Sequence, residues 1–160
     1  MKVLIVSDTH GRHYNLEEIL EREKPLDLLI HLGDAEGAED YIEVIAECPV
    51  EAVAGNNDFY TNLPRELEIQ IGAYKVLITH GHYYYVNGGI EHIRRAVLER
   101  NIDIAMFGHT HKPFFEEDEN VIILNPGSIS FPRQEGKNPS YMVMNLDEEG
   151  KAKFLLCYLY

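Results

Sequence analysis

The stretch KVLIVSDTH at residues 2–10 contains an apolar run, Val3–Val6, that passes directly into a polar cluster holding Asp8 and His10. A short apolar run closed by polar turn residues is typical of a buried β-strand. Five further apolar runs end in the same way, at Gly33-Asp34, Gly55-Asn56-Asn57-Asp58, Thr79-His80-Gly81-His82, Gly108-His109-Thr110-His111 and Asn125-Pro126-Gly127-Ser128. The repeated pattern predicts a sheet whose strands each end in a polar cluster.

Helical patterns lie between several of these strands. Apolar stripes predict helices around Leu16–Leu20, Tyr41–Ile45 and Ile90–Val97, the first of them capped by Asn15. Later strands follow one another directly, over Leu67–Thr79 and in a closing hairpin over Tyr141–Tyr160, while Glu116–Asn120 is expected to be a solvated turn. Crossover helices early and hairpins late predict an α/β protein in which helices cover mixed sheets.

The polar clusters are candidates for a metal centre, because ligands bind beyond the carboxyl ends of strands in such sheets. Side chains two positions apart in extended chain point the same way, so Asp8 with His10, and His109 with His111, are expected to reach one site. One metal cannot easily use seven ligands that include four imidazoles, whereas two metals sharing a carboxylate can. Mixed imidazole, carboxylate and amide ligands suit manganese, iron, cobalt, nickel or zinc better than calcium.

Length and charge limit the function. The chain has 160 residues, which suits one domain over residues 1–160. Its 14 basic and 27 acidic residues give a net charge of −13 with no basic stripe, which disfavours nucleic-acid partners. No signal-peptide core or membrane span is visible, and Cys48 and Cys157 lack metal or redox spacing. We therefore expect a cytoplasmic protein without membrane contact.

The ordered blocks resemble a known family. Asp8-Thr9-His10, Gly33-Asp34, Gly55-Asn56-Asn57-Asp58, His80-Gly81-His82 and Gly108-His109-Thr110-His111 resemble the calcineurin-like metallophosphoesterase superfamily. The short chain and Asn125–Ser128 resemble its small single-domain prokaryotic phosphodiesterase branch. The resemblance, from Met1 to about Arg133, implies an α/β/β/α sandwich of two mixed β-sheets flanked by helices, with the metal centre at the C-terminal ends of strands. It also implies the ligand sets: one metal on Asp8, His10 and His111, the other on Asn56, His80 and His109, with Asp34 bridging.

This resemblance implies an enzyme that hydrolyses phosphodiester bonds in a small phosphoester substrate. Two divalent metal ions would activate a hydroxide, with manganese expected and nickel, iron, cobalt or zinc as alternatives. Many family members carry a histidine after the ligand asparagine, as a phosphate contact or leaving-group acid, but this chain has Asn57, a poor proton donor. His82 is the nearest substitute by motif, either in catalysis or as a hydrogen-bond partner of a ligand.

Other functions and properties stay open. A non-catalytic metal-binding scaffold of the same fold is the main alternative, as in a vesicle-coat subunit of the superfamily. A nuclease is disfavoured by the acidic balance. Apolar residues near Tyr83–Val86 or Phe154–Tyr160 are expected to allow a homodimer or higher homo-oligomer, and Asn125–Ser128 and Arg133 to shape the pocket rim. Metal affinity is expected to fall below about pH 6, because bound imidazoles must be neutral.

Overall fold

The structure, a computed structural model, describes all residues 1–160 and contains two five-stranded sheets. The first sheet has the order β10-β9-β1-β2-β3. Its strands are β1 (Lys2–Val6), β2 (Leu28–His31), β3 (Val50–Ala52), β9 (Ser140–Leu146) and β10 (Ala152–Tyr158). Strands β1, β2 and β3 run parallel, whereas β9 pairs antiparallel with both β1 and β10. The first sheet is therefore mixed.

The second sheet has the order β4-β5-β6-β8-β7 and is mixed in the same way. Its strands are β4 (Glu66–Ile71), β5 (Tyr74–Thr79), β6 (Ile104–Met106), β7 (Pro113–Glu117) and β8 (Ile122–Pro126). Strands β5, β6 and β8 are parallel, while β4 and β7 are antiparallel edge strands.

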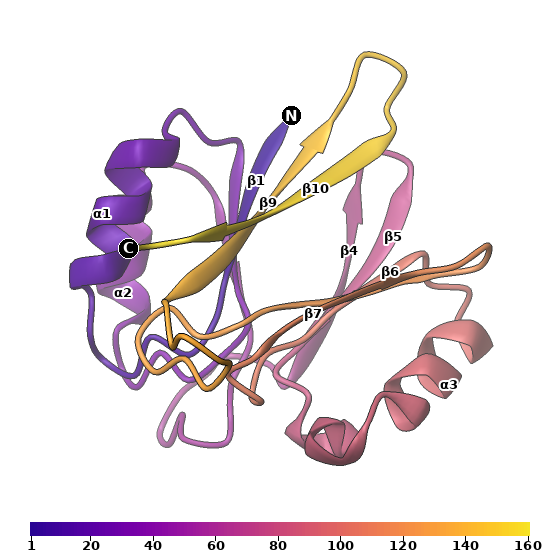
Figure 1. Cartoon of the computed structure of the whole chain (residues 1–160), viewed down its shortest axis with the longest axis horizontal. Helices are drawn as coiled ribbons and strands as arrows, with labels where there is room; N and C mark the ends of the chain where they lie inside the picture. The colour runs from indigo at the N-terminus through magenta and orange to yellow at the C-terminus, as the bar shows by residue number, and fades with distance from the viewer.

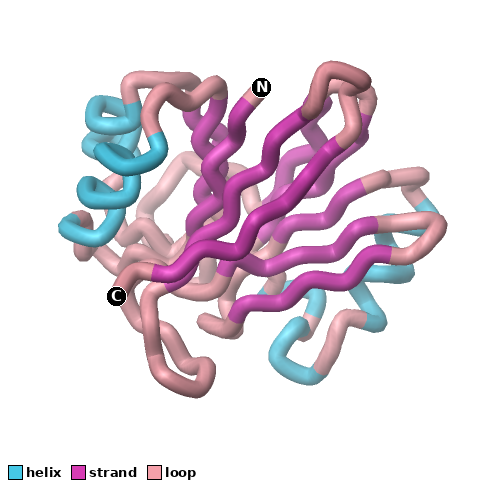
Figure 2. Tube along the Cα trace, turned by 45° about the horizontal axis from the view of Figure 1, so that its top comes forward, coloured by secondary structure: helices cyan, strands magenta, loops and turns pink.

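Three α-helices cover the outer faces of the two sheets, as Figures 1 and 2 show from two directions. Helices α1 (Tyr14–Glu23) and α2 (Glu39–Ala46) bury Leu16, Ile19 and Ile42 against the first sheet. Helix α3 (Glu91–Glu99) lies on the opposite side of the molecule and buries Ile93 and Val97 against the second sheet. The predicted α/β/β/α sandwich of two mixed sheets is confirmed.

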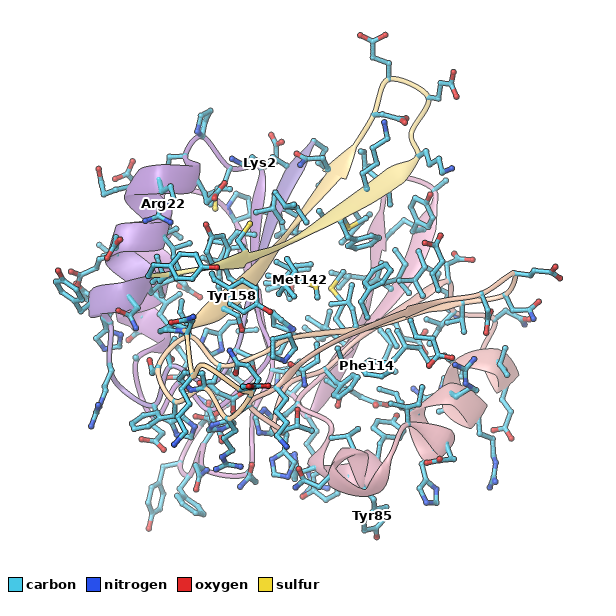
Figure 3. All side chains as sticks on the ribbon, viewed as in Figure 1. Lys2, Arg22, Tyr85, Phe114, Met142 and Tyr158 are labelled. Carbon is cyan, nitrogen blue, oxygen red and sulfur yellow. The ribbon has the colours of Figure 1, made fainter.

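The main core lies between the sheets. Alternate side chains of β1 and β9, such as Ile5 and Met142, meet Val76, Ile78 and Met106 of the second sheet in one buried cluster. Met142 lies near the middle of the side-chain view, between the two sheets (Figure 3). This packing matters for the site, because it brings the carboxyl ends of the parallel strands of both sheets to one end of the sandwich.

Three details differ from the sequence-based predictions. Asn15 does not cap α1: His13 holds the cap position, and Asn15 Nδ2 instead donates to the Ile129 carbonyl at 2.7 Å. Strand β3 ends at Ala52, two residues before the apolar run Ala52–Ala54 that precedes Gly55 is complete. Glu116 and Glu117 belong to strand β7 rather than to a turn, since charged side chains are well tolerated on an exposed edge strand.

The helices and the exposed side chains bear on two other expectations, those about membrane contact and self-association. None of the helices has both the length and the apolar composition needed to cross a membrane. Tyr83 and Tyr85 are exposed beside α3, and Tyr85 points outward in Figure 3. Leu155 and Leu156 are exposed on the edge strand β10. Both surfaces proposed for self-association are therefore accessible on the single chain.

Candidate metal centre

The candidate ligands sit in loops whose backbone is left-handed rather than extended. Asp8, His10, Asp34, His109 and His111 have φ angles between 48° and 69°. The expectation that alternation along extended chain aligns Asp8 with His10 is therefore wrong, although the side chains do converge. Non-glycine residues rarely adopt positive φ, and such backbone strain clusters at functional sites. Here the left-handed backbone turns each loop back toward the end of the sandwich where the strands finish, and the ligand side chains meet there.

The first group of candidate ligands is Asp8, His10 and His111. His111 Nε2 lies 3.1 Å from Asp8 Oδ1, and His10 Nε2 lies 3.7 Å from the same oxygen. The Nε2 atoms of the two histidines are 3.3 Å apart. All three ligand atoms lie within 4.8 Å of one another, close enough to share one cation.

The second group is Asn56, His80 and His109. Asn56 Oδ1 lies 2.9 Å from His80 Nε2 and 3.0 Å from His109 Nδ1. The two imidazole rings pack edge to face with centroids 5.1 Å apart. These side chains come from the loops after β3, β5 and β6, so three strand ends build this half of the site.

Asp34 lies between the two groups. Its Oδ2 atom is 3.7 Å from His10 Nε2 and 3.4 Å from His80 Nε2. Asp8 also reaches across, because Asp8 Oδ1 is 3.8 Å from His80 Nε2, and Asp8, Asp34 and His80 form a second close set of ligand atoms. The structure thus brings all seven candidate ligands together, with Asp34 in the position that a shared carboxylate would need.

The hydrogen bonds of the imidazole rings show that this donor set fits cations. His111 Nδ1 donates to the Phe131 carbonyl at 2.7 Å, and His80 Nδ1 donates to the Leu32 carbonyl at 2.7 Å. A carbonyl only accepts, so each Nδ1 holds a proton, and each ring in its neutral form presents a lone pair at Nε2. Those lone pairs face carboxylate oxygens, and the fully buried Asp8 Oδ1 accepts no hydrogen bond. A divalent cation between these atoms would satisfy both sides.

The carboxylates are ionised in this surrounding. Burial acts to raise the pKa of Asp8, but His10 and His111 outweigh it and hold that pKa well below its usual range. Burial likewise opposes ionisation of Asp34, but His80 and the Asn57 hydrogen bonds lower the pKa of Asp34 to about 2. In return, the Asp8 carboxylate raises the pKa of His10 to about 9. The site therefore offers two negative charges to any cation at neutral pH.

Glycines precede the ligands because a side chain would collide with the site. A Cβ atom on Gly55 would lie 2.1 Å from Asp34 Oδ1, and one on Gly108 would lie 2.0 Å from Ser7 Oγ. Ser7 Oγ in turn donates to Asp8 Oδ2 at 2.6 Å. The Gly-Asn and Gly-His pairs in the sequence thus reflect close approach of one loop to the next.

Asp58 connects two ligand loops, a role that the sequence did not suggest. Its Oδ2 accepts hydrogen bonds from the backbone N–H groups of Asp34 and Gly55, both at 2.7 Å. Its Oδ1 accepts a third from Glu36 N at 2.7 Å. One carboxylate therefore holds the Asp34 loop against the loop that contains Asn56.

Asn125 and Ser128 support the site from behind instead of forming its rim. Both are fully buried, and Asn125 Nδ2 donates to the Gly108 carbonyl at 2.9 Å. Ser128 Oγ donates to the Asp8 carbonyl at 3.0 Å. Arg133 is exposed and does lie at the rim, where it lines a cavity of about 670 Å³ and another of about 590 Å³.

Comparison with known proteins identifies the family. The sequence matches the calcineurin-like phosphoesterase superfamily domain over residues 1–149. The chain belongs to this superfamily.

Individual relatives of the chain agree with that assignment. It is 34% identical over 154 residues to a probable metallophosphoesterase of Methanothermobacter thermautotrophicus, covering 93% of this chain and 88% of the relative. It is 29% identical over 148 residues to Phosphodiesterase MJ0936 of Methanocaldococcus jannaschii, covering 79% of this chain and 83% of that protein. The alignment with the crystal structure of Vps29 from Entamoeba histolytica covers 100% of this chain and 100% of that chain, with a TM-score of 0.79. At 24% sequence identity, this similarity shows only a shared fold.

The two candidate catalytic residues, Asn57 and His82, both lie at the candidate metal centre. Asn57 donates to Asp34 twice, from its backbone N to Oδ1 at 2.8 Å and from Nδ2 to Oδ2 at 2.9 Å. The His82 ring packs edge to face on the His80 ring, with centroids 5.4 Å apart, and its buried Nδ1 has no hydrogen-bond partner. Burial and the neighbouring His80 lower the pKa of His82 to about 4, so its ring is neutral at pH 7.

One further contact was invisible in the sequence. Asn87 Nδ2 lies 2.9 Å from His109 Nε2 and so fixes the ring of this candidate ligand. Asn87 belongs to the short helix η2 (Val86–Gly88), which follows η1 (His82–Tyr84). Asn87 and His109 are 22 residues apart in the sequence, so no short motif contains both of them.

Proposed function

We propose that this phosphoesterase hydrolyses phosphodiester bonds in a small substrate with two divalent cations, manganese being the expected metal. The ligands in this proposal are Asp8, His10, Asp34, Asn56, His80, His109 and His111. The observation that supports it best is that Nε2 of His80 lies 3.4 Å from Asp34 Oδ2 and Nε2 of His111 lies 3.1 Å from Asp8 Oδ1, while Nδ1 of each ring lies 2.7 Å from a backbone carbonyl oxygen. Such an arrangement is stable only with cations, or with extra protons, in between.

The charge of the centre suits a phosphate ester. Asp8 and Asp34 contribute two negative charges, so a pair of divalent ions leaves the site positive inside an acidic protein. When bound, two such ions lower the pKa of a shared water and stabilise the negative charge that develops on the phosphoryl oxygens. The water oxygen adds to phosphorus, one phosphorus–oxygen ester bond breaks, and the products are a phosphomonoester and an alcohol.

The chain's own residues orient this reaction. Asn57 holds both oxygens of Asp34 by hydrogen bonds and thereby fixes the direction of the shared carboxylate. His82, being neutral at pH 7, can donate only one N–H and is a poor acid for the leaving group. We infer that solvent protonates the departing oxygen, so aryl esters, which leave without a proton, are the favoured assay substrates.

The test uses two substitutions at the centre. Asp34→Asn and His109→Ala should each lower manganese-dependent hydrolysis of bis(4-nitrophenyl) phosphate by about a thousandfold or more, since each removes a ligand. His92→Ala, which changes an exposed histidine on α3, is the matched control and should retain full activity. Circular dichroism checks that all three variants keep the fold. Undiminished turnover by either ligand variant, purified and saturated with manganese, would contradict the proposal.

A second candidate is a non-catalytic metal-binding scaffold. Its support is the shared fold with Vps29 and the lack of a good proton donor at Asn57 and His82. A panel of monoesters, diesters, cyclic nucleotides and short oligonucleotides separates the two functions. Stoichiometric metal in the purified protein with no turnover of any substrate would favour the scaffold.

A further inference from the structure

Three arginines near the centre lack carboxylate partners in a strongly acidic protein. The chain has 27 acidic and 14 basic residues, and Arg22, Arg94 and Arg100 form ion pairs with glutamate or aspartate. Arg12, Arg65 and Arg133 form no such pair, and all three line cavities beside the candidate ligands. Their guanidinium groups are therefore free to bind an incoming group.

Arg12 lies over an aromatic ring next to the first ligand group. Its guanidinium carbon is 4.4 Å from the centre of the Phe131 ring. Phe131 also contacts the His10 ring, with centroids 5.3 Å apart. The Phe131 carbonyl accepts a hydrogen bond from Nδ1 of His111. The cavity here measures about 590 Å³ and includes Arg133.

Arg65 forms the equivalent pair next to the second ligand group. Its guanidinium carbon is 4.4 Å from the centre of the Tyr83 ring. The Tyr83 ring packs on His82, with centroids 4.2 Å apart. The cavity here measures about 390 Å³ and includes Asn56. The two arginine–aromatic pairs of the chain thus lie at the two halves of the metal centre, one at each.

The acidic groups in these cavities are already engaged. In the first cavity, Glu36 Oε1 lies 2.9 Å from His10 Nδ1. In the second, the Asp58 carboxylate accepts three backbone N–H groups. Neither carboxylate forms an ion pair with Arg12, Arg65 or Arg133.

We propose that Arg12 with Phe131, and Arg65 with Tyr83, form two arginine platforms that bind the two ester arms of a small phosphodiester bearing planar aromatic groups, as in a dinucleotide. This inference rests on the proposed function. A guanidinium that lies over a ring can present its other face to a planar group, and stacking of a base gives about tenfold tighter binding per arm. A monoester has one arm and fills one platform, so this arrangement favours diesters.

The rest of the surface limits the length of such a substrate. The net charge of −13 opposes a long polyanion, because no basic track continues from the platforms. A dinucleotide places one phosphoryl group at the metals and one base on each platform. Longer oligonucleotides should therefore bind no more tightly than the dinucleotide.

The experiment compares two esters that share a leaving group. Thymidine 5′-(4-nitrophenyl phosphate) has two planar arms, whereas methyl 4-nitrophenyl phosphate has one, and both carry one negative charge. With manganese, the wild type should show a kcat/KM about tenfold higher for the thymidine ester. Because the chemistry of the leaving group is the same, the ratio of the two values measures recognition of the second arm.

Substitutions in the platforms test which residues supply this ratio. Arg12→Gln and Arg65→Gln should each lower kcat/KM for the thymidine ester by about fivefold or more, while only one of them lowers it for the methyl ester. Phe131→Ala and Tyr83→Ala should act in the same direction as their arginine partners. Arg95→Gln changes an exposed arginine on α3 that has no aromatic partner and should leave both values within about twofold. Manganese affinity, measured for every variant, identifies any loss caused by damage to the centre.

The outcomes separate this inference from the proposed function. If both esters are hydrolysed but no platform variant changes their ratio, the platforms are refuted and the phosphodiesterase stands. If the wild type hydrolyses neither ester, the proposed function fails. Equilibrium dialysis of a thymidine dinucleotide with a phosphorothioate linkage then tests whether the platforms bind such a ligand. Binding that both arginine variants weaken would support them, and absence of binding in manganese would overturn them.

Discussion

His80 and His111 each donate one ring N–H to a main-chain carbonyl, and this detail sets what their other nitrogen can do. His109 is different, because the nitrogen that faces Asn56 is Nδ1 and its Nε2 lies beside the Asn87 amide. For Nδ1 to bind a cation, Nε2 must keep the proton and donate it to the Asn87 oxygen. In that tautomer the side-chain amide of Asn87 is flipped, so that its oxygen faces the ring.

The proton on His10 predicts how metal binding depends on pH. In the metal-free protein the Asp8 carboxylate raises the pKa of His10 to about 9, compared with about 6.5 for an unperturbed histidine. A cation needs the neutral ring, so protons compete with it up to about pH 9. Manganese affinity should therefore keep rising between about pH 6.5 and 9, higher than the limit near pH 6 expected from the sequence. Calorimetric titration in buffers of different ionisation enthalpy measures both the affinity and the protons released.

The same group gives an independent readout in the absence of metal. Because the folded protein raises the pKa of His10, this residue stabilises the metal-free fold fully below about pH 6.5, and that contribution is lost as the pH rises through about 9. Chelator-treated protein should thus become easier to unfold with urea over this range, while metal binding becomes tighter. A manganese affinity that stays constant from about pH 6.5 to 9 would refute this account of His10.

At the scale of elements, the loop after β2 and the loop after β3 act as one unit through Asp58. Asp58→Asn replaces one acceptor oxygen by a donor, so at least one of the three backbone N–H groups loses its partner. We expect destabilisation by about 3 kcal/mol, or a Tm lower by roughly 6–12 °C. Manganese affinity should fall about tenfold or more, because Asp34 is no longer held in place. Calorimetric melting and manganese titration give the two values.

Asp147→Asn is the matched control for this prediction. Asp147 Oδ1 also accepts two backbone N–H groups, from Glu149 at 3.0 Å and Lys151 at 2.9 Å, but in the exposed turn between β9 and β10. This variant should lose some stability and keep the manganese affinity of the wild type. If Asp58→Asn and Asp147→Asn bind manganese equally well, the proposed role of Asp58 in positioning Asp34 is wrong.

The elements that sequence patterns predicted well are those whose burial repeats along the chain. Strand β1 follows from Val3–Val6, and the hairpin of β9 and β10 follows from the turn at Asp147–Gly150. Strand β7 was missed because its Glu116 and Glu117 face solvent on a sheet edge, which leaves no apolar alternation to detect. Burial patterns therefore reveal an edge strand whose apolar residues alternate, such as β4, and miss one without alternation, such as β7.

The candidate site divides in a similar way between what local sequence encodes and what it does not. The seven candidate ligands could be predicted because each directly follows an apolar strand. The left-handed backbone at Asp8 and His10 could not, since it depends on how neighbouring loops pack. Nor could the hydrogen bonds of Asn87 and Asp58, which join loops that are distant in sequence.

At the scale of the whole molecule, two sheets packed face to face bring strand ends from both halves of the chain to one place. Asp8, Asp34 and Asn56 follow strands of the first sheet, whereas His80 and His109 follow strands of the second. Neither sheet alone contains both ligand groups. Helices α1, α2 and α3 lie on the outer sides of the two sheets in Figure 1. The net charge of −13 makes a local cation pair the main attraction for an anionic ester.

The central claim is that side chains from both sheets hold two cations that share Asp34. Anomalous scattering from crystals grown with excess manganese, recorded on both sides of the manganese absorption edge, tests it most directly. The account predicts two peaks about 3.5–4 Å apart, with Asp34 between them, one peak beside His10 and His111 and the other beside His80 and His109. A single peak, or none, in crystals of fully loaded protein would contradict it.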